Sequence, residues 1–134
     1  MFSCPLARKV VSLCATRGLN ALSGSLVYRI GWPGRSPELV YPGTADHPKA
    51  HFRGNTLLYS GGGGAFISFD RGGYSYTVFT AIGRGWGQKE GVVVDAAAGR
   101  RTYLPCRERA DSVLGNDWFQ GAGIPAASTD FELP

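Results

Sequence analysis

Apolar and polar side chains alternate in short runs between residues 25 and 104, and turns rich in glycine or proline separate the runs. This period of two places one set of side chains on each face of a β-strand, whereas a helix repeats about every 3.6 residues. The runs with this pattern are residues 26–30, 38–41, 56–59, 65–69, 74–81, 92–94 and 100–104. We therefore predict a mainly β fold, an antiparallel meander that forms a small sandwich or barrel.

The last third of the chain loses this alternation. Residues 107–115 are predicted as a short helix, and residues 117–120 as a single helical turn whose two aromatic side chains plug one end of the sheet. Phe131 and Leu133 alternate with acidic residues, which predicts a last edge strand. The 134 residues suffice for one domain.

Residues 1–24 differ in character from the rest of the chain. They carry basic but no acidic residues: Arg8, Lys9 and Arg17. A basic start, the apolar run of residues 10–15 and small residues before Gly24 are typical of a secretory signal peptide. Arg17 interrupts the apolar run and leaves it shorter than such signals usually are.

An amphipathic helix is the alternative for this segment, because Leu6, Val10 and Leu13 are spaced three to four residues apart. Both interpretations stay open at this point. We expect residues 1–24 to be a leader or helix and residues 25–134 to form a single β domain. The export signal predicts a periplasmic or secreted protein, and the helix leaves a cytoplasmic location open.

The chain has three cysteines, Cys4, Cys14 and Cys106, and no Cys-x-x-Cys motif. An odd count of three does not make a disulfide framework. Cys4 could pair with Cys14 if the leader is retained, and Cys106 could pair with either or with neither. We expect Cys106, after Leu104 and Pro105, to be a small buried apolar residue.

The net charge of +4 suggests nucleic-acid binding at first. Without the three basic residues of the first 24, 11 basic residues remain against all 10 acidic ones, so the rest of the chain carries only +1. Phosphate backbones are bound by clustered Lys and Arg, so the charge argues against a nucleic-acid partner. No apolar run approaches the roughly 18 residues of a membrane-spanning helix.

No motif in the sequence combines the residues of a known catalytic or metal centre. His47 and His51 are four residues apart, but no third zinc ligand is identifiable, and we expect two solvated loop histidines. Asp70, Glu90 and Asp95 lie at predicted turns, where carboxylates form local hydrogen bonds. We predict no enzyme, no catalytic residue, no metal and no cofactor.

Two glycine-rich segments are the candidate binding sites. The first is the run Gly61, Gly62, Gly63 and Gly64, called the glycine run below. A phosphate-binding glycine loop precedes a helix, whereas this run precedes a predicted strand, so it is not such a loop. It is either a mobile recognition loop or a bulge where two backbones approach closely.

The second segment is the predicted turn at residues 83–87, which interleaves Arg84 and Trp86 with glycines. Arg and Trp are enriched among residues that dominate protein interfaces, and Arg84 could stack on Trp86. The alternative is a turn whose tryptophan packs on the rim of the sheet.

Four stretches together resemble a family of small exported β-rich bacterial proteins to which no activity is assigned. They are residues 58–66 with the glycine run, 82–86, 91–94 and 104–106. The resemblance covers most of residues 25–134 and implies bacterial origin, export and a β fold. It transfers no functional residue.

We expect a non-enzymatic β domain that binds another protein through the glycine run, Arg84 and Trp86, as small inhibitor or immunity proteins do. One alternative is a β-barrel that binds a carbohydrate or apolar ligand, lined by Tyr28, Tyr74 and Tyr76. A second alternative is a purely structural protein. Single-stranded nucleic-acid binding by aromatic stacking is a third alternative, against which the low charge argues.

Overall fold

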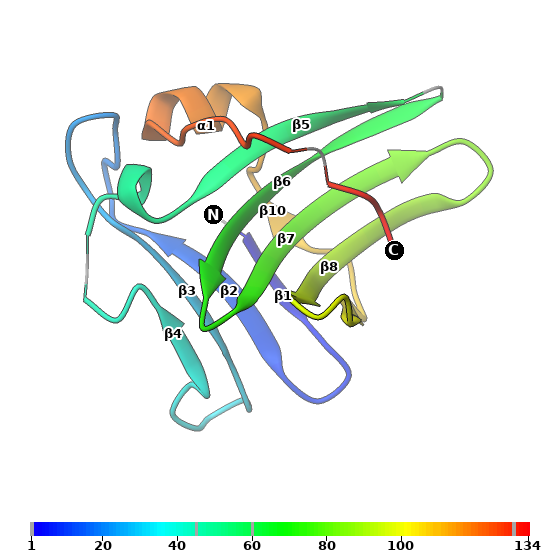
Figure 1. Cartoon of the computed structure of the whole chain (residues 1–134), viewed down its shortest axis with the longest axis horizontal. Helices are drawn as coiled ribbons and strands as arrows, with labels where there is room; N and C mark the ends of the chain where they lie inside the picture. Colours follow the sequence, from blue (N-terminus) through cyan, green and yellow to red (C-terminus); the bar gives the residue numbers. More distant parts are fainter. Residues whose placement is uncertain (1, 45, 60, 130) are drawn as a thin grey trace.

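A computed structural model describes residues 2–44, 46–59, 61–129 and 131–134 of the chain (Figure 1). These residues form two antiparallel five-stranded sheets, which confirms the predicted mainly β class. In spatial order, sheet A consists of β10 (Asp111–Ser112), β1 (Phe2–Pro5), β2 (Val10–Ala15), β3 (Leu26–Gly31) and β4 (Leu39–Tyr41). Sheet B consists of β5 (Arg53–Tyr59), β6 (Gly62–Arg71), β7 (Tyr74–Gly83), β8 (Gly87–Ala96) and β9 (Arg101–Pro105). Each sheet keeps two edge strands, so neither closes into a barrel.

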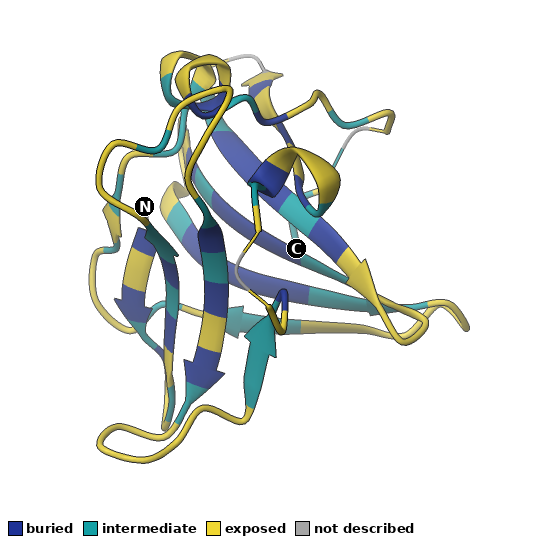
Figure 2. Cartoon of the chain, turned by 90° about the vertical axis from the view of Figure 1, so that its left-hand side faces the viewer, coloured by how far each residue is buried: buried dark blue, intermediate teal, exposed yellow. Residues whose placement is uncertain are grey.

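The main core lies between the two sheets, because the period-two alternation turns one apolar face of each sheet inward. Buried and exposed residues therefore alternate along the strands of sheet A in Figure 2. Facing residues include Leu13 and Tyr28 from sheet A, and Ile67, Phe69 and Val78 from sheet B. The hairpin turn between β6 and β7 has positive φ at Gly72 and Gly73, as the sequence predicts.

The N-terminal segment is part of sheet A. β1 and β2 replace the helix that the spacing of Leu6, Val10 and Leu13 predicted. β2 pairs with β3 from Ala15 opposite Leu26 onward, so strands on both sides of the expected boundary at residue 24 share one sheet. No helix among the described residues is long and apolar enough to cross a membrane.

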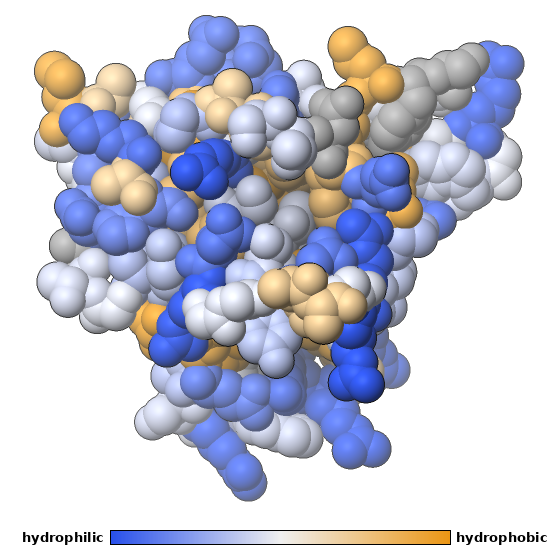
Figure 3. All heavy atoms as spheres, viewed as in Figure 1, coloured by the Kyte–Doolittle hydropathy of each residue, from blue (hydrophilic) through white to orange (hydrophobic). Residues whose placement is uncertain are grey.

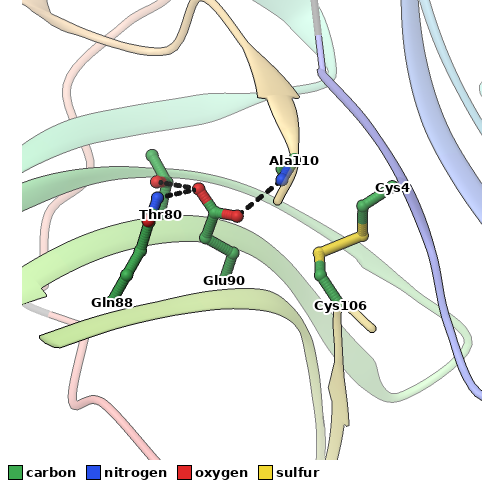
Figure 4. Close-up of a disulfide and its surroundings, with 6 residues drawn as sticks. All are labelled: Cys4, Thr80, Gln88, Glu90, Cys106 and Ala110. Carbon is green, nitrogen blue, oxygen red and sulfur yellow. Dashed lines mark hydrogen bonds between the residues drawn. A yellow bond between two sulfur atoms is a disulfide. The ribbon is translucent and has the colours of Figure 1, made fainter. Parts of the chain in front are cut away.

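A disulfide joins Cys4 of β1 to Cys106, which follows β9 (Figure 4). Of the pairings that the sequence left open, Cys106 forms the one with Cys4, and it is half-buried rather than the small buried apolar residue that we expected. The buried Glu90 carboxylate in β8 holds the next residues by accepting a hydrogen bond from the Ala110 N–H at 2.6 Å. Figure 4 also shows Thr80 and Gln88 donating to the same carboxylate.

This anchoring explains why residues 107–115 do not form the predicted helix. Arg107 donates its N–H to the Pro5 carbonyl at 2.8 Å, which draws the chain from sheet B across to sheet A. There β10 pairs with β1. Backbone bonds between the sheets and the buried carboxylate therefore outweigh the local helical pattern.

The helical turn predicted at residues 117–120 is confirmed as α1 (Asn116–Ala122), and a short 3₁₀ turn, η1, spans Pro48–Ala50. Phe119 of α1 is buried against Gly54 of β5, where any larger side chain would crowd its ring. The last residues do not form the predicted edge strand. They cross the outer face of sheet B (Figure 1), where Phe131 and Leu133 pack on a second apolar cluster around Phe66 and Phe79.

Candidate functional site

Two hairpin turns meet at one end of sheet B, and they contain the two segments that the sequence singles out. The Arg84 N–H donates to the Gly61 carbonyl at 3.1 Å, which joins the β7–β8 turn to the β5–β6 turn. In Figure 1 both hairpins extend past the strands of sheet A. We call Leu58, the glycine run and residues 82–87 the B tip.

Most of the glycine run is strand rather than loop, because β6 begins at Gly62. A side chain at Gly64 would overlap the Thr80 carbonyl oxygen, and one at Gly62 would overlap the Ile82 carbonyl oxygen. The backbones of β6 and β7 thus approach so closely that only glycine fits between them. Of the two interpretations that the sequence left open, this geometry matches the close backbone approach.

Gly64→Ala is therefore expected to lower the free energy of unfolding by about 3 kcal/mol, the upper end of the usual cost of overpacking. Chemical unfolding followed by circular dichroism measures the change. Gly43→Ala is the matched control, because its side chain would meet open space at ordinary φ, and it should stay within about 0.5 kcal/mol. Equal effects of the two substitutions would contradict the close approach.

Trp86 packs on the sheet and is also accessible. A side chain at Gly83 would overlap its indole ring, so the ring lies directly on that glycine, with 40% of the residue exposed. The cation over the ring is Lys89, whose Nζ lies 5.3 Å from the ring centroid. The Arg84 side chain is exposed, and its Cβ lies 2.9 Å from where a side chain at Gly61 would begin.

Leu58 and Ile82 add an exposed apolar surface to the B tip that the sequence reasoning missed. They are 89% and 54% exposed and lie on either side of Gly63 in the strand register, so a gap of one side chain separates them. Figure 3 shows apolar side chains at this end of the β5–β6 hairpin. The signal was available, because adjacent Leu57 and Leu58 must point to opposite faces of a strand.

Arg84 is the one charged residue of the B tip. Lys89 lies beside the tip, over the Trp86 ring, and its Nζ donates to the carbonyl of Pro134 at 3.0 Å. A partner that carries negative charge around an apolar contact would complement this surface.

A second feature is a polar hollow of about 420 Å³ on the outer face of sheet B. Asp70 and Asp95, expected as separate turn residues, both line it, together with Arg53. Asp70 accepts a hydrogen bond from Ser75 at 2.6 Å, and Asp95 is paired with Arg101 at 2.7 Å. Such a set of donors and acceptors suits a small polar ligand.

The two histidines have partners instead of being solvated. His51 Nε2 lies 2.9 Å from Asp46 Oδ2, its Nδ1 lies 3.4 Å from the Tyr41 hydroxyl, and His47 Nε2 lies 2.7 Å from the Asn20 carbonyl. The hydrogen bond from His51, aided by the His47 N–H, lowers the pKa of the Asp46 carboxyl. These bonds fix the loop before η1. Among the described residues, no group of three or more His, Cys, Asp or Glu could hold a metal ion.

The three tyrosines expected to line a ligand cavity do not surround one. Tyr28 is fully buried between the sheets, Tyr76 is stacked on Phe69, and Tyr74 is exposed beside the hairpin turn. Burial raises the pKa of the Tyr28 phenol well above its usual range, and its hydroxyl has no hydrogen-bond partner among the described residues. Burial and the Glu90 carboxylate also raise the pKa of the Tyr103 phenol.

No protein-family model, curated protein or solved structure matches the chain.

Proposed function

We propose that the protein binds another protein through the B tip and does not act as an enzyme. The observation that carries this proposal is the junction of the two hairpin turns by the Arg84–Gly61 hydrogen bond. It brings Arg84 and Trp86 to the same end of sheet B as Leu58 and Ile82, with Trp86 over Gly83 on the outer face and Leu58 and Ile82 on the opposite face. Apolar and aromatic side chains beside a cation are typical of the residues that dominate binding energy.

The proposal extends to a location outside the cytoplasm, in the manner of a small exported inhibitor or immunity protein. The Cys4–Cys106 disulfide supports this location, because disulfides persist in oxidising compartments. The charge of the B tip supports an acidic partner surface.

Replacing Arg84 and Trp86 together with alanine is expected to weaken partner binding by about 2 kcal/mol, roughly thirtyfold. The partner would be captured from the source organism on a tagged chain, identified by mass spectrometry and then titrated in purified form. The matched control replaces Trp32 and Arg35, which lie in the β3–β4 connection of sheet A, with Trp32 39% exposed. The proposal fails if both double variants bind alike, or if the Arg84 and Trp86 variant loses binding only because it unfolds.

The polar hollow on sheet B favours a second function, the binding of a small polar ligand such as a carbohydrate. Its size lies within the roughly 300–1,000 Å³ of small-molecule sites, and its Arg53 side chain is exposed. A panel of neutral and acidic sugars should shift the NMR amide signals of Ser75 and Thr77 in the wild type and not in Arg53→Ala. Unchanged spectra at millimolar sugar would rule this function out.

A further inference from the structure

The β5 strand forms an edge of sheet B, and the chain itself shows what this edge accepts. Gly54 donates its N–H to the Pro125 carbonyl at 3.0 Å and accepts the Ala127 N–H at 3.2 Å. Gly54 and Ala126 form a parallel bridge. An extended segment thus pairs with β5 through main-chain hydrogen bonds at its first outward position.

The next outward positions on this edge are open. The N–H and C=O groups of an edge strand point away from the sheet at every second residue. After Gly54, the residues whose main-chain groups point outward are therefore Thr56 and Leu58. The Thr56 N–H donates to the side-chain oxygen of its neighbour Asn55 at 2.9 Å. Neither main-chain group of Leu58 has a partner among the described residues outside sheet B.

The chain leaves the edge after Ala127 and crosses to the outer face of the sheet (Figure 1). Between this returning segment and β5 lies a hollow of about 670 Å³, lined by residues 55–58 and 131–133. Side chains on the outer side of an added strand would occupy this hollow. Those on its inner side would lie beside Leu58.

The surroundings define the chemistry of the added strand. The exposed Leu58 side chain favours an apolar neighbour on the inner side. On the outer side, the hollow is lined by the apolar residues Leu57, Phe131 and Leu133 and by Glu132, whose carboxylate disfavours an acidic neighbour. An extended segment of apolar residues without acidic ones meets both conditions.

We propose that the edge of β5 at Thr56 and Leu58 is a strand-addition site for an extended, apolar segment of a partner protein. This inference rests on the proposed function and specifies the partner of the B tip. In the free protein the Thr56 N–H donates to the Asn55 side chain, and on binding it would donate to a carbonyl of the partner strand instead.

The direct test uses the full chain, labelled with ¹⁵N, and a blocked peptide of alternating valine and threonine. Binding should slow hydrogen exchange of the Thr56 and Leu58 amides by about tenfold or more. The same peptide with glutamate in place of threonine, or with alternate amides methylated, should bind about tenfold more weakly. The absence of protection at both amides at millimolar peptide overturns the proposal.

Variants of the chain separate this inference from the proposed function. Leu58→Pro removes an outward donor without breaking a bond to β6 and should abolish protection by the peptide. Leu22→Lys, at an equally exposed leucine (90%) remote in sequence, should not. If the captured partner binds Leu58→Pro normally but not the Arg84 and Trp86 variant, the proposed function stands and strand addition is wrong. Dimerisation of the chain that Leu58→Pro removes would also overturn the proposal, since the edge would then bind a second copy.

Discussion

A chain that lacks residues 1–24 is expected not to fold. The deletion removes β1 and β2 from the middle of sheet A and leaves β10 without its pairing strand. It also removes buried apolar side chains of the main core, namely Phe2, Leu6, Val11 and Leu13. At about 1.5–3 kcal/mol each, these four contribute roughly 6–12 kcal/mol, as much as the whole stability of a typical domain.

The ¹H–¹⁵N NMR spectrum of the shortened chain should show the narrow amide dispersion of an unfolded protein. Leu22→Lys is the control within the same segment, because this exposed side chain should tolerate the change. A well-dispersed spectrum from the shortened chain would show that residues 25–134 fold alone, contrary to this structure.

Replacing Cys4 and Cys106 with alanine is expected to lower the free energy of unfolding by about 4 to 5 kcal/mol. The disulfide closes a loop with a sequence separation of 102, so its loss returns a large conformational entropy to the unfolded chain. In urea unfolding, the oxidised protein should have a high midpoint, and the reduced protein and the variant should both have lower midpoints.

Cys14→Ala is the control for this experiment, because Cys14 is a free, half-buried cysteine on β2. It should cost at most about 1 kcal/mol. If Cys14→Ala destabilised the protein as much as the double replacement does, or if reduction left the midpoint unchanged, the disulfide would not contribute as we describe.

Much of sheet B is predictable from the sequence because its strands alternate over long stretches. The turn at Gly72 and Gly73 fixes the β6–β7 register, and the register determines which side chains share a face. In the N-terminal segment, Val11 and Leu13 face the core and Val10 faces solvent, a period of two. That signal spans too few residues to stand out against the basic residues and the coincidental helical spacing.

Features that depend on contacts between distant residues are beyond a single sequence. The pairing of Cys4 with Cys106 follows from the way the chain crosses from β9 to sheet A. The junction of Gly61 with Arg84 requires the register of β5 to β8, although both segments stand out separately. The role of Gly64 likewise requires the distance between two backbones, which composition does not contain.

The most direct test of the B tip as the binding surface is photocrosslinking in cells of the source organism. Benzoylphenylalanine replaces either Trp86 or Trp32, two exposed tryptophans on opposite sheets. We predict one dominant protein adduct from position 86, identified by mass spectrometry, and none of that mass from position 32. Equal adducts from both positions, or none from position 86 in a folded and well-expressed protein, would contradict the account.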